Sequence, residues 1–166
     1  RNLGNEFEKF LPTLQNYYAQ PGAVQNVTIY QGLKGLRVAH EHTYLKLKKG
    51  EEFYYLGIPA SQPQEHHRYW QKDHERRAKA GIISKSLFNS DTPREILENR
   101  NSYSLSDARY MPTDIKTPAY FLIYKDTTMI AIASKDPIAI EIVNQEIANS
   151  FKSYFQEFWK RSKPFK

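Results

Sequence analysis

The residues from Ala119 to Tyr124 constrain the fold of this chain more than any other stretch. Six residues follow one another there as Ala, Tyr, Phe, Leu, Ile and Tyr, with no charged or amide side chain between them. A strand with one face in water alternates apolar and polar residues, whereas a nearly continuous apolar run is typical of a strand covered on both faces. We therefore expect this run to form the middle strand of a sheet that is covered by helices.

A hairpin is expected to follow this strand. Four polar residues, 125–128, separate it from a second apolar run at 129–133. Two such runs joined by a short polar segment are typical of antiparallel strands. A third run, Ile138–Val143, follows Asp136 and Pro137 and predicts one more strand.

Upstream of the hairpin, short strands alternate with helices. The pattern predicts strands at residues 26–30, 53–58, 82–88 and 108–111, and helices at 33–48, 64–80 and 94–99. Strands that alternate with helices build a sheet between helical layers, joined by right-handed crossovers. The sequence therefore predicts an α/β fold with a mixed, mostly parallel sheet flanked by helices.

Residues 144–160 predict a long closing helix with an aromatic face. Asn144 suits the N-cap position, and Glu146 lies in the first turn. We interpret the aromatic face as core or as a dimer surface. Its members are Ile147, Phe151, Tyr154, Phe155, Phe158 and Trp159.

Residues 6–19 predict an amphipathic helix at the other end of the chain. Pro12 is expected to break or kink it, because proline cannot donate the helical hydrogen bond, unless a second short helix begins near Leu11 and places Pro12 in its first turn. The apolar stripe is expected either to dock on the core of the domain or to pair with a second copy. The stripe consists of Phe7, Phe10, Leu11, Leu14, Tyr17 and Tyr18.

Composition narrows the classes of function. The chain has 24 Lys and Arg against 18 Asp and Glu, which gives a net charge of +6 without a dense basic block. Such a charge is compatible with an anionic partner and only weakly favours nucleic acid. The absence of cysteine excludes a disulfide scaffold, a thiolate zinc site and a cysteine nucleophile. No signal peptide or long apolar run is present, so we expect a cytoplasmic protein; the start at Arg1, in mid-helical pattern, suggests a fragment.

Residues 64–80 carry the candidate metal ligands and most of the clustered basic residues. His66, His67 and His74 alternate with carboxylates there. Useful ligand pairs on a helix fall three or four residues apart on one face, and no two of these histidines have that spacing. We interpret the basic residues as a solvated face, with nucleic-acid binding as the rival interpretation. They are Arg68, Lys72, Arg76, Arg77 and Lys79. No hydrolase or nucleotide-binding motif is present anywhere in the chain.

Three segments share the pattern of a known family. They read Val-Thr-Ile-Tyr-Gln-Gly at 27–32 followed by Gly35, Arg-Arg-Ala-Lys-Ala-Gly-Ile at 76–82, and Asn-Gln-Glu-Ile-Ala-Asn-Ser-Phe from 144. From about residue 24 onward the chain resembles the C-terminal effector domain of archaeal TrmB-type transcriptional regulators. This resemblance implies that residues 1–20 are a linker or dimerisation helix after a winged helix-turn-helix that is not visible here. Residues 21–166 would then be the effector-sensing domain.

The effector domain of this family is similar to the phospholipase D fold, whose catalytic motif is HxKxxxxD. Aligned through the hairpin, the motif places its Asp on Asp126, its Lys on Phe121 and its His on Ala119, with a following Gly-Ser near Ala133 and Ser134. A covalent phosphohistidine mechanism needs the imidazole. The resemblance therefore implies a phospholipase D-like scaffold without its chemistry, and we interpret Asp126 as a hairpin-turn residue.

A ligand crevice is expected where the parallel strands end, as is usual in open α/β sheets. Aromatic, Asn and His side chains there would suit a polyhydroxyl ligand, and the resemblance implies a small-molecule effector, for example a sugar. Trp70 and Phe88 are, as residue types, more often core. A dedicated sugar-binding module has no obvious room after Ser134. The expected ligand-binding residues are Gly57, Pro59, Ser61, His66, Trp70, Phe88, Asn89, Ser134 and Lys135.

The sequence thus favours a non-catalytic, effector-binding and homodimeric domain of a TrmB-like regulator, with DNA held by a winged helix outside this chain and no cofactor implied. Two rival functions remain open. One is a phospholipase D-type phosphodiesterase or nuclease, against which the missing His and Lys argue. The other is a stand-alone nucleic-acid-binding module, whose affinity would fall steeply with salt.

Overall fold

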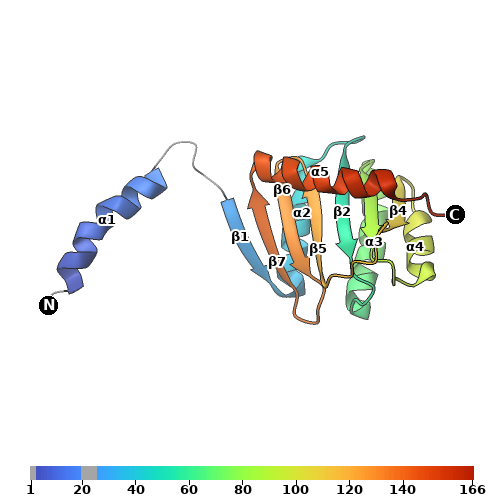
Figure 1. Cartoon of the computed structure of the whole chain (residues 1–166), viewed down its shortest axis with the longest axis horizontal. Helices are drawn as coiled ribbons and strands as arrows, with labels where there is room; N and C mark the ends of the chain where they lie inside the picture. Colours follow the sequence, from blue (N-terminus) through green and yellow to red (C-terminus); the bar gives the residue numbers. More distant parts are fainter. Residues whose placement is uncertain (1–2, 20–25) are drawn as a thin grey trace.

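The computed structural model describes residues 3–19 and 26–166, with the side chains of 17–19 outside that description. It shows a seven-stranded sheet in the order β1-β7-β6-β5-β2-β3-β4 (Figure 1). The elements are α1 (Leu3–Ala19), β1 (Asn26–Gln31), α2 (Gly32–Lys46), β2 (Glu52–Ile58), α3 (Gln64–Ala80), β3 (Ile83–Phe88), α4 (Arg94–Asn101), β4 (Ser106–Tyr110), β5 (Ala119–Tyr124), β6 (Thr127–Ile132), β7 (Ile138–Val143) and α5 (Gln145–Arg161).

The apolar strand β5 is the central strand of the sheet, as the sequence predicts. It pairs with β2 on one side and β6 on the other. Tyr120, Leu122 and Tyr124 enter one core cluster, whereas Phe121 and Ile123 enter a second. Alternate residues point to opposite faces of a strand, so both faces of β5 are apolar because both are covered.

The expected mixed sheet flanked by helices is confirmed, but the expected majority of parallel pairs is wrong. Only β2 with β3 and β3 with β4 run parallel among the described strands. The β5-β6-β7 meander, the β1 edge and the β2–β5 pair are antiparallel. The reason is that β1 lies at the far edge beside β7 and not beside β2. The connection from β1 through α2 to β2 therefore adds no parallel pair.

The turn of the β5–β6 hairpin is shorter than the polar segment suggests. Lys125 adopts a positive φ of 48°, and Thr127 already pairs with Tyr124. Thr127 and Thr128 are fully buried strand residues, which β-branched threonine tolerates well. The Thr127 hydroxyl accepts a hydrogen bond from Lys46 Nζ at 2.8 Å, so burial does not leave it unpaired.

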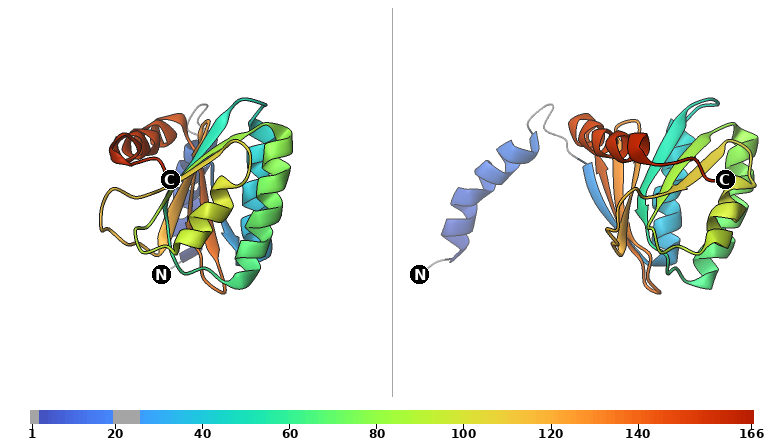
Figure 2. Two further views of the ribbon diagram at one scale, coloured as in Figure 1. Left: turned by 90° about the vertical axis from the view of Figure 1, so that its right-hand side faces the viewer. Right: turned by 45° about the vertical axis from the view of Figure 1, so that its right-hand side comes forward.

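Two helical layers cover the sheet. Figure 2 shows α5 on one face and α2 with α3 on the other. The α5 layer closes over β2, β5 and β6 through Phe155, which is fully buried. Asn144 caps α5 as predicted, because its Oδ1 accepts a hydrogen bond from Ile147 N at 2.9 Å.

The basic face expected on α3 is only partly solvated. Arg77 is 1% exposed, and its guanidinium donates to the carbonyls of Ile82 and Leu105 at 2.5 and 3.0 Å. Arg76 forms an ion pair with Glu41. The interpretation as a solvated face is therefore wrong for Arg77, which the structure buries, whereas Arg76 is exposed as expected.

At the N-terminus, α1 is one continuous helix with Pro12 inside it, so the expected break is wrong. A proline removes a single helical hydrogen bond, and helical residues on both sides continue the turn pattern. Phe7 and Phe10 on its apolar stripe are exposed. Within the described residues, no helix combines the length and apolar character needed to span a membrane.

Candidate functional site

The positions aligned with the phospholipase D motif lie on the α5 side of β5. Ala119 and Phe121 share this face, and the Phe121 ring stacks on Phe151 of α5 with centroids 5.0 Å apart. Asp126 lies in the hairpin turn, where its Oδ1 accepts a hydrogen bond from Lys46 Nζ at 2.9 Å. These positions thus present a methyl group and a packed aromatic ring where the motif needs an imidazole and a cation.

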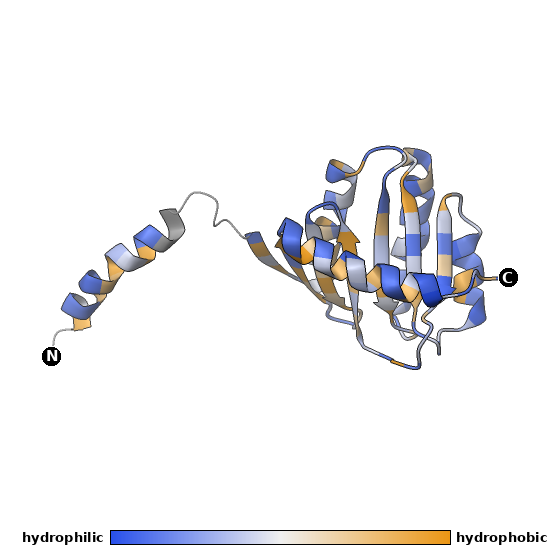
Figure 3. Ribbon diagram, turned by 45° about the horizontal axis from the view of Figure 1, so that its top comes forward, coloured by the Kyte–Doolittle hydropathy of each residue, from blue (hydrophilic) through white to orange (hydrophobic). Residues whose placement is uncertain are grey.

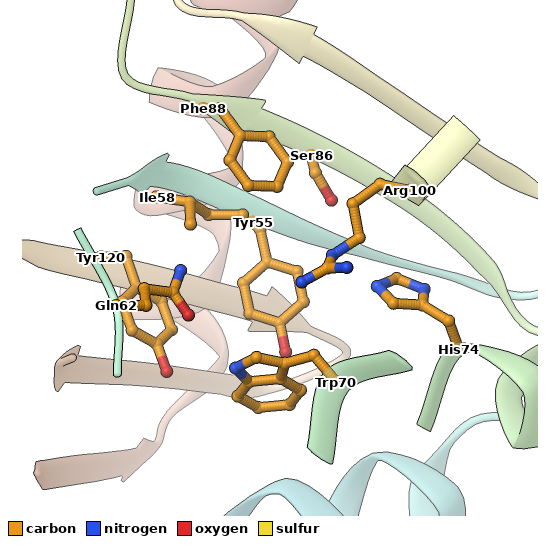
Figure 4. A pocket seen from close by; sticks show the side chains of 9 residues that line it. All are labelled: Tyr55, Ile58, Gln62, Trp70, His74, Ser86, Phe88, Arg100 and Tyr120. Atoms are coloured by element: carbon orange, nitrogen blue, oxygen red, sulfur yellow. The ribbon is translucent and has the colours of Figure 1, made fainter. Parts of the chain in front are cut away.

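A separate pocket opens on the opposite face of the same strands, between the sheet and α3 with α4 (Figure 4). Its free volume is about 30 Å³. Alternation along β5 separates the two places, since Tyr120 faces the pocket and its neighbours Ala119 and Phe121 face α5. The pocket is lined by Tyr55, Ile58, Gln62, Trp70, His74, Ser86, Phe88, Arg100 and Tyr120.

Aromatic rings form the rigid wall of this pocket. The Tyr55 ring lies 6.2 Å from that of Trp70 and 5.9 Å from that of Tyr120. Behind them, the buried His40 ring meets Trp70 edge-on at 4.8 Å. Edge-to-face contacts of this kind fix ring orientation beyond simple area burial. The wall is therefore preorganised.

Polar groups line the opposite side. Arg100 from α4 is only 5% exposed, and its N–H groups reach Asn99 Oδ1 at 2.5 Å and His67 Nδ1 at 3.4 Å. His74 Nδ1 accepts from Arg77 Nε at 3.2 Å. Burial, followed by the charges of Arg100 and Arg77, holds the pKa of His74 well below its ordinary value, so this imidazole is neutral.

Arg100 is not among the residues predicted from the sequence, although a signal was present. Arg100 lies three residues after the fully buried Leu97 on the short helix α4. Residues three apart share one face of a helix. A charged residue on the apolar face of a short helix indicates either a buried partner or a site.

The structure brings together only some of the predicted ligand-binding residues. Trp70 and Phe88 line the pocket, and His66 is buried one turn before Trp70 with its Nδ1 unpartnered. Pro59 is buried and Ser61 exposed on the loop that also carries the pocket residue Gln62.

The other predicted residues lie elsewhere. Asn89 donates its amide to the carbonyl of Thr117 at 3.0 Å, and Gly57 adopts a φ of 76° beside it, so both hold the loops at the strand ends. Ser134 and Lys135 are exposed on the β6–β7 turn. Their strand is separated from β2 by β5, and neither lines the pocket.

The described conformation of the pocket admits only very small molecules. A free volume of about 30 Å³ accommodates roughly two water molecules, since one needs ~10–15 Å³ in this measure. Pockets for drug-sized ligands span about 300–1,000 Å³. A sugar would therefore require the Gln62 loop or a lining side chain to move.

Several solved structures resemble this arrangement. TrmBL2, an archaeal chromatin protein that shows a novel mode of DNA binding, aligns with a TM-score of 0.57 and 14% identity over 98% of this chain and 62% of its own. Nuc, a phospholipase D family member from Salmonella typhimurium, aligns with a TM-score of 0.62 and 16% identity over 86% of this chain and 99% of its own. NucT from Helicobacter pylori gives a TM-score of 0.58 and 12% identity, covering 86% of this chain and all of its own.

These likenesses show a phospholipase D-like fold. No protein-family model matches the chain, and no curated protein matches it. The chain spans 62% of the length of TrmBL2, so part of that protein has no counterpart here. Neighbours of both kinds, a DNA-binding chromatin protein and phospholipase D family members, share the fold.

Proposed function

We propose that this chain is the non-catalytic, ligand-sensing and dimerising domain of a TrmB-like transcriptional regulator. The observation that carries the proposal is the pair Ala119 and Phe121 at the motif positions of β5. Without an imidazole no phosphohistidine can form, and without a cation the phosphate charge is not balanced. The Phe151 ring stacked on Phe121 occupies the space beside that position.

Ligand sensing is supported by the pocket on the opposite face. It joins residues of β2, β3, β5, α3 and α4, so a ligand there contacts both the sheet and the helices that cover it. A ligand shifts a conformational equilibrium only by its differential affinity for the two states. A small molecule that widens this pocket would favour the arrangement in which α3 and α4 stand further from the sheet.

The role in a DNA-binding protein rests on TrmBL2. That protein binds DNA and matches 98% of this chain while 38% of its own length stays unmatched (100% minus 62%). The unmatched part leaves room for a separate DNA-binding domain. By this proposal a winged helix outside this chain contacts DNA, and ligand binding to the present domain changes the position of that winged helix.

A hydrolysis assay tests the non-catalytic part of the proposal. The purified chain is incubated with bis(p-nitrophenyl) phosphate and with single-stranded DNA, with Nuc as the positive control. We expect no turnover above a buffer blank. Turnover that is lost in Asp126→Ala or Ser134→Ala, the two polar residues left at aligned motif positions, would overturn the proposal and favour a phosphodiesterase.

A thermal-shift screen tests ligand sensing independently. A ligand that binds only the folded state raises the melting temperature by mass action. We expect at least one metabolite to stabilise the chain, and Trp70→Ala to abolish that effect while the variant still melts cooperatively. A ligand whose effect survives Trp70→Ala does not bind in this pocket.

A further inference from the structure

Arg100 is a buried cation with no buried anion beside it. It is 5% exposed, yet none of the ion pairs among residues 3–19 and 26–166 includes it. No Asp or Glu lines the pocket that it faces. Buried charges in proteins are ordinarily paired, because an ion that leaves water without a partner loses its hydration and gains nothing in return.

The second buried arginine, Arg77, shows what a structural guanidinium looks like in this fold. Arg77 donates to the carbonyls of Ile82, Ser104 and Leu105 and so ties α3 to the loop before β4. Arg100 reaches only the side chains of Asn99 and His67, the latter at 3.4 Å. Figure 4 shows its guanidinium in the pocket beside Tyr55 and His74, and a guanidinium carries five N–H donors, more than these two contacts use.

Other polar groups around the pocket are unpaired or only weakly paired. Tyr55 is 7% exposed and its hydroxyl makes no hydrogen bond. The Oε1 atom of Gln62 is buried without a partner as well, and a rotated amide would present its NH₂ instead. Ser86 Oγ shares one weak contact with Ser84 Oγ at 3.3 Å. Figure 4 shows Ser86 on the same side of the pocket as Arg100, and Gln62 on the other side of the Tyr55 ring.

We infer that the pocket binds the carboxylate of a small organic acid, with Arg100 as its counter-ion and Tyr55 and Ser86 as hydrogen-bond donors. This inference rests on the proposed ligand-sensing function and names the chemical class of the ligand. A carboxylate can accept two parallel hydrogen bonds from one guanidinium, and a single negative charge balances a single positive one. A phosphate monoester carries about −1.5 to −2 charges at pH 7 and would exceed that balance.

The walls and the volume narrow the class further. Trp70, Phe88 and Tyr120 form an apolar surface opposite the guanidinium, which suits a short hydrocarbon body. The free volume of about 30 Å³ favours the shortest monocarboxylates, such as formate, acetate and propionate. All but the smallest of these acids require displacement of Gln62.

The positive charge of this pocket gives a sugar no advantage. A polyhydroxyl ligand gains nothing from an uncompensated cation, and leaving that cation without an anion keeps its desolvation cost. The pocket therefore discriminates by charge before it discriminates by shape. Acetamide and propionamide, which match the acids in shape and lack the charge, are the appropriate comparison ligands.

Fluorescence of Trp70 reports binding in the pocket directly. The chain has two tryptophans, and the other, Trp159, packs on Phe155 in the core cluster under α5. In a Trp159→Phe background, acetate, propionate, their amides and inorganic phosphate are titrated at constant ionic strength, with melting temperature as a parallel readout. We expect the acids to change Trp70 emission and to raise the melting temperature above the chloride control, and the amides and phosphate to do neither.

Two arginine variants separate binding from structure. Arg100→Met removes the buried charge and keeps most of the volume, so the unliganded variant should melt at the same temperature as the parent or higher, and acid affinity should fall about 10- to 100-fold. Arg77→Met is the matched control and should melt lower. Tyr55→Phe should weaken acid binding by a few fold, roughly, without lowering the melting temperature.

The inference is overturned if the acids act no differently from chloride, if the amides bind as well as the acids, or if Arg100→Met melts as far below the parent as Arg77→Met. Binding of a neutral metabolite that is abolished by Trp70→Ala would overturn the carboxylate assignment while leaving ligand sensing intact. Phosphodiester turnover would instead overturn the proposed function, whatever the outcome with the acids.

Discussion

His40 and His74 are buried in their neutral forms, which makes stability depend on pH. Burial lowers the pKa of His40 against the opposing effect of Asp73, and burial with Arg100 and Arg77 lowers that of His74. An unfolded histidine has the ordinary value of 6.5. Below pH 6.5 the unfolded chain therefore binds more protons than the folded one, and stability falls as pH falls.

We predict that the melting temperature is constant from pH 8 to about 7 and drops between pH 6.5 and 5. Each pH unit in that window costs up to about 1.4 kcal/mol for each histidine that stays neutral. Carboxylates such as Glu41, whose pKa is lowered from 4.5 mainly by Arg76, contribute only at lower pH. His74→Gln should flatten the profile in calorimetric scans, and an unchanged slope would contradict the prediction.

Gly57 occupies a backbone conformation that other residues adopt at a cost. Its φ is 76°, and an added Cβ would lie 3.4 Å from Thr117 Oγ1, which is an ordinary contact. The cost of Gly57→Ala therefore comes from the left-handed backbone and not from a clash, at about 1–2 kcal/mol. Chemical denaturation should show this loss with an unchanged m-value; a neutral effect would contradict the backbone argument.

At the scale of elements, the N-cap of α5 makes a measurable contribution. Asn144 Oδ1 accepts from Ile147 N at 2.9 Å. Asn144→Ala leaves that donor without its partner and should cost about 1 kcal/mol, or roughly 2–4 °C in melting temperature. The control is Asn149→Ala, an exposed position inside the same helix, which should have little effect. Equal losses from the two variants would show that the cap is not responsible.

Elements with a strong periodic signal were predictable from the sequence. The continuous apolar run gave the central strand β5, and aromatic residues at helical spacing gave α5. The majority of parallel pairs was not predictable, because the position of β1 beside β7 depends on long-range pairing that no local pattern encodes. Thr127 and Thr128 were assigned to the turn because polarity outweighed their β-branched character.

The candidate site was only partly predictable for a related reason. Trp70 and Phe88 were expected near the ends of parallel strands, and they line the pocket. Arg100 was missed because a charged residue on a short helix is ordinarily exposed, and only its spacing from Leu97 indicated otherwise. Ser134 and Lys135 were expected at the same crevice, in the loop after the hairpin, and the structure places them away from the pocket.

On the scale of the whole molecule, α5 covers only part of its face of the sheet. It packs on β2, β5 and β6, whereas apolar residues continue across β7 to the edge strand β1 (Figure 3). Ile29, Ile140 and Ile130 are neighbours in register across these strands. Contiguous apolar patches of this kind mark interaction sites on soluble proteins. The exposed members are Val27, Ile29, Ile132 and Ile138.

We predict that a second copy covers this patch in the proposed homodimer. The patch lies on the same face of the sheet as Phe121, beyond the part of that face that α5 covers. Ile29→Lys and Ile132→Lys should each weaken self-association about 30-fold, equivalent to the ~2 kcal/mol of an interface hot spot. Sedimentation equilibrium measures the change.

The control for these variants is Leu45→Lys on α2, which replaces a leucine that is 82% exposed away from the patch. It should leave self-association unchanged, because adding one charge elsewhere alters neither the apolar area nor its register. Phe10→Lys on α1 tests the other exposed apolar stripe. If Phe10→Lys dissociates the dimer and Ile132→Lys does not, self-association occurs through α1 and the sheet patch is free for another occupant; a monomeric parent at high concentration would contradict both.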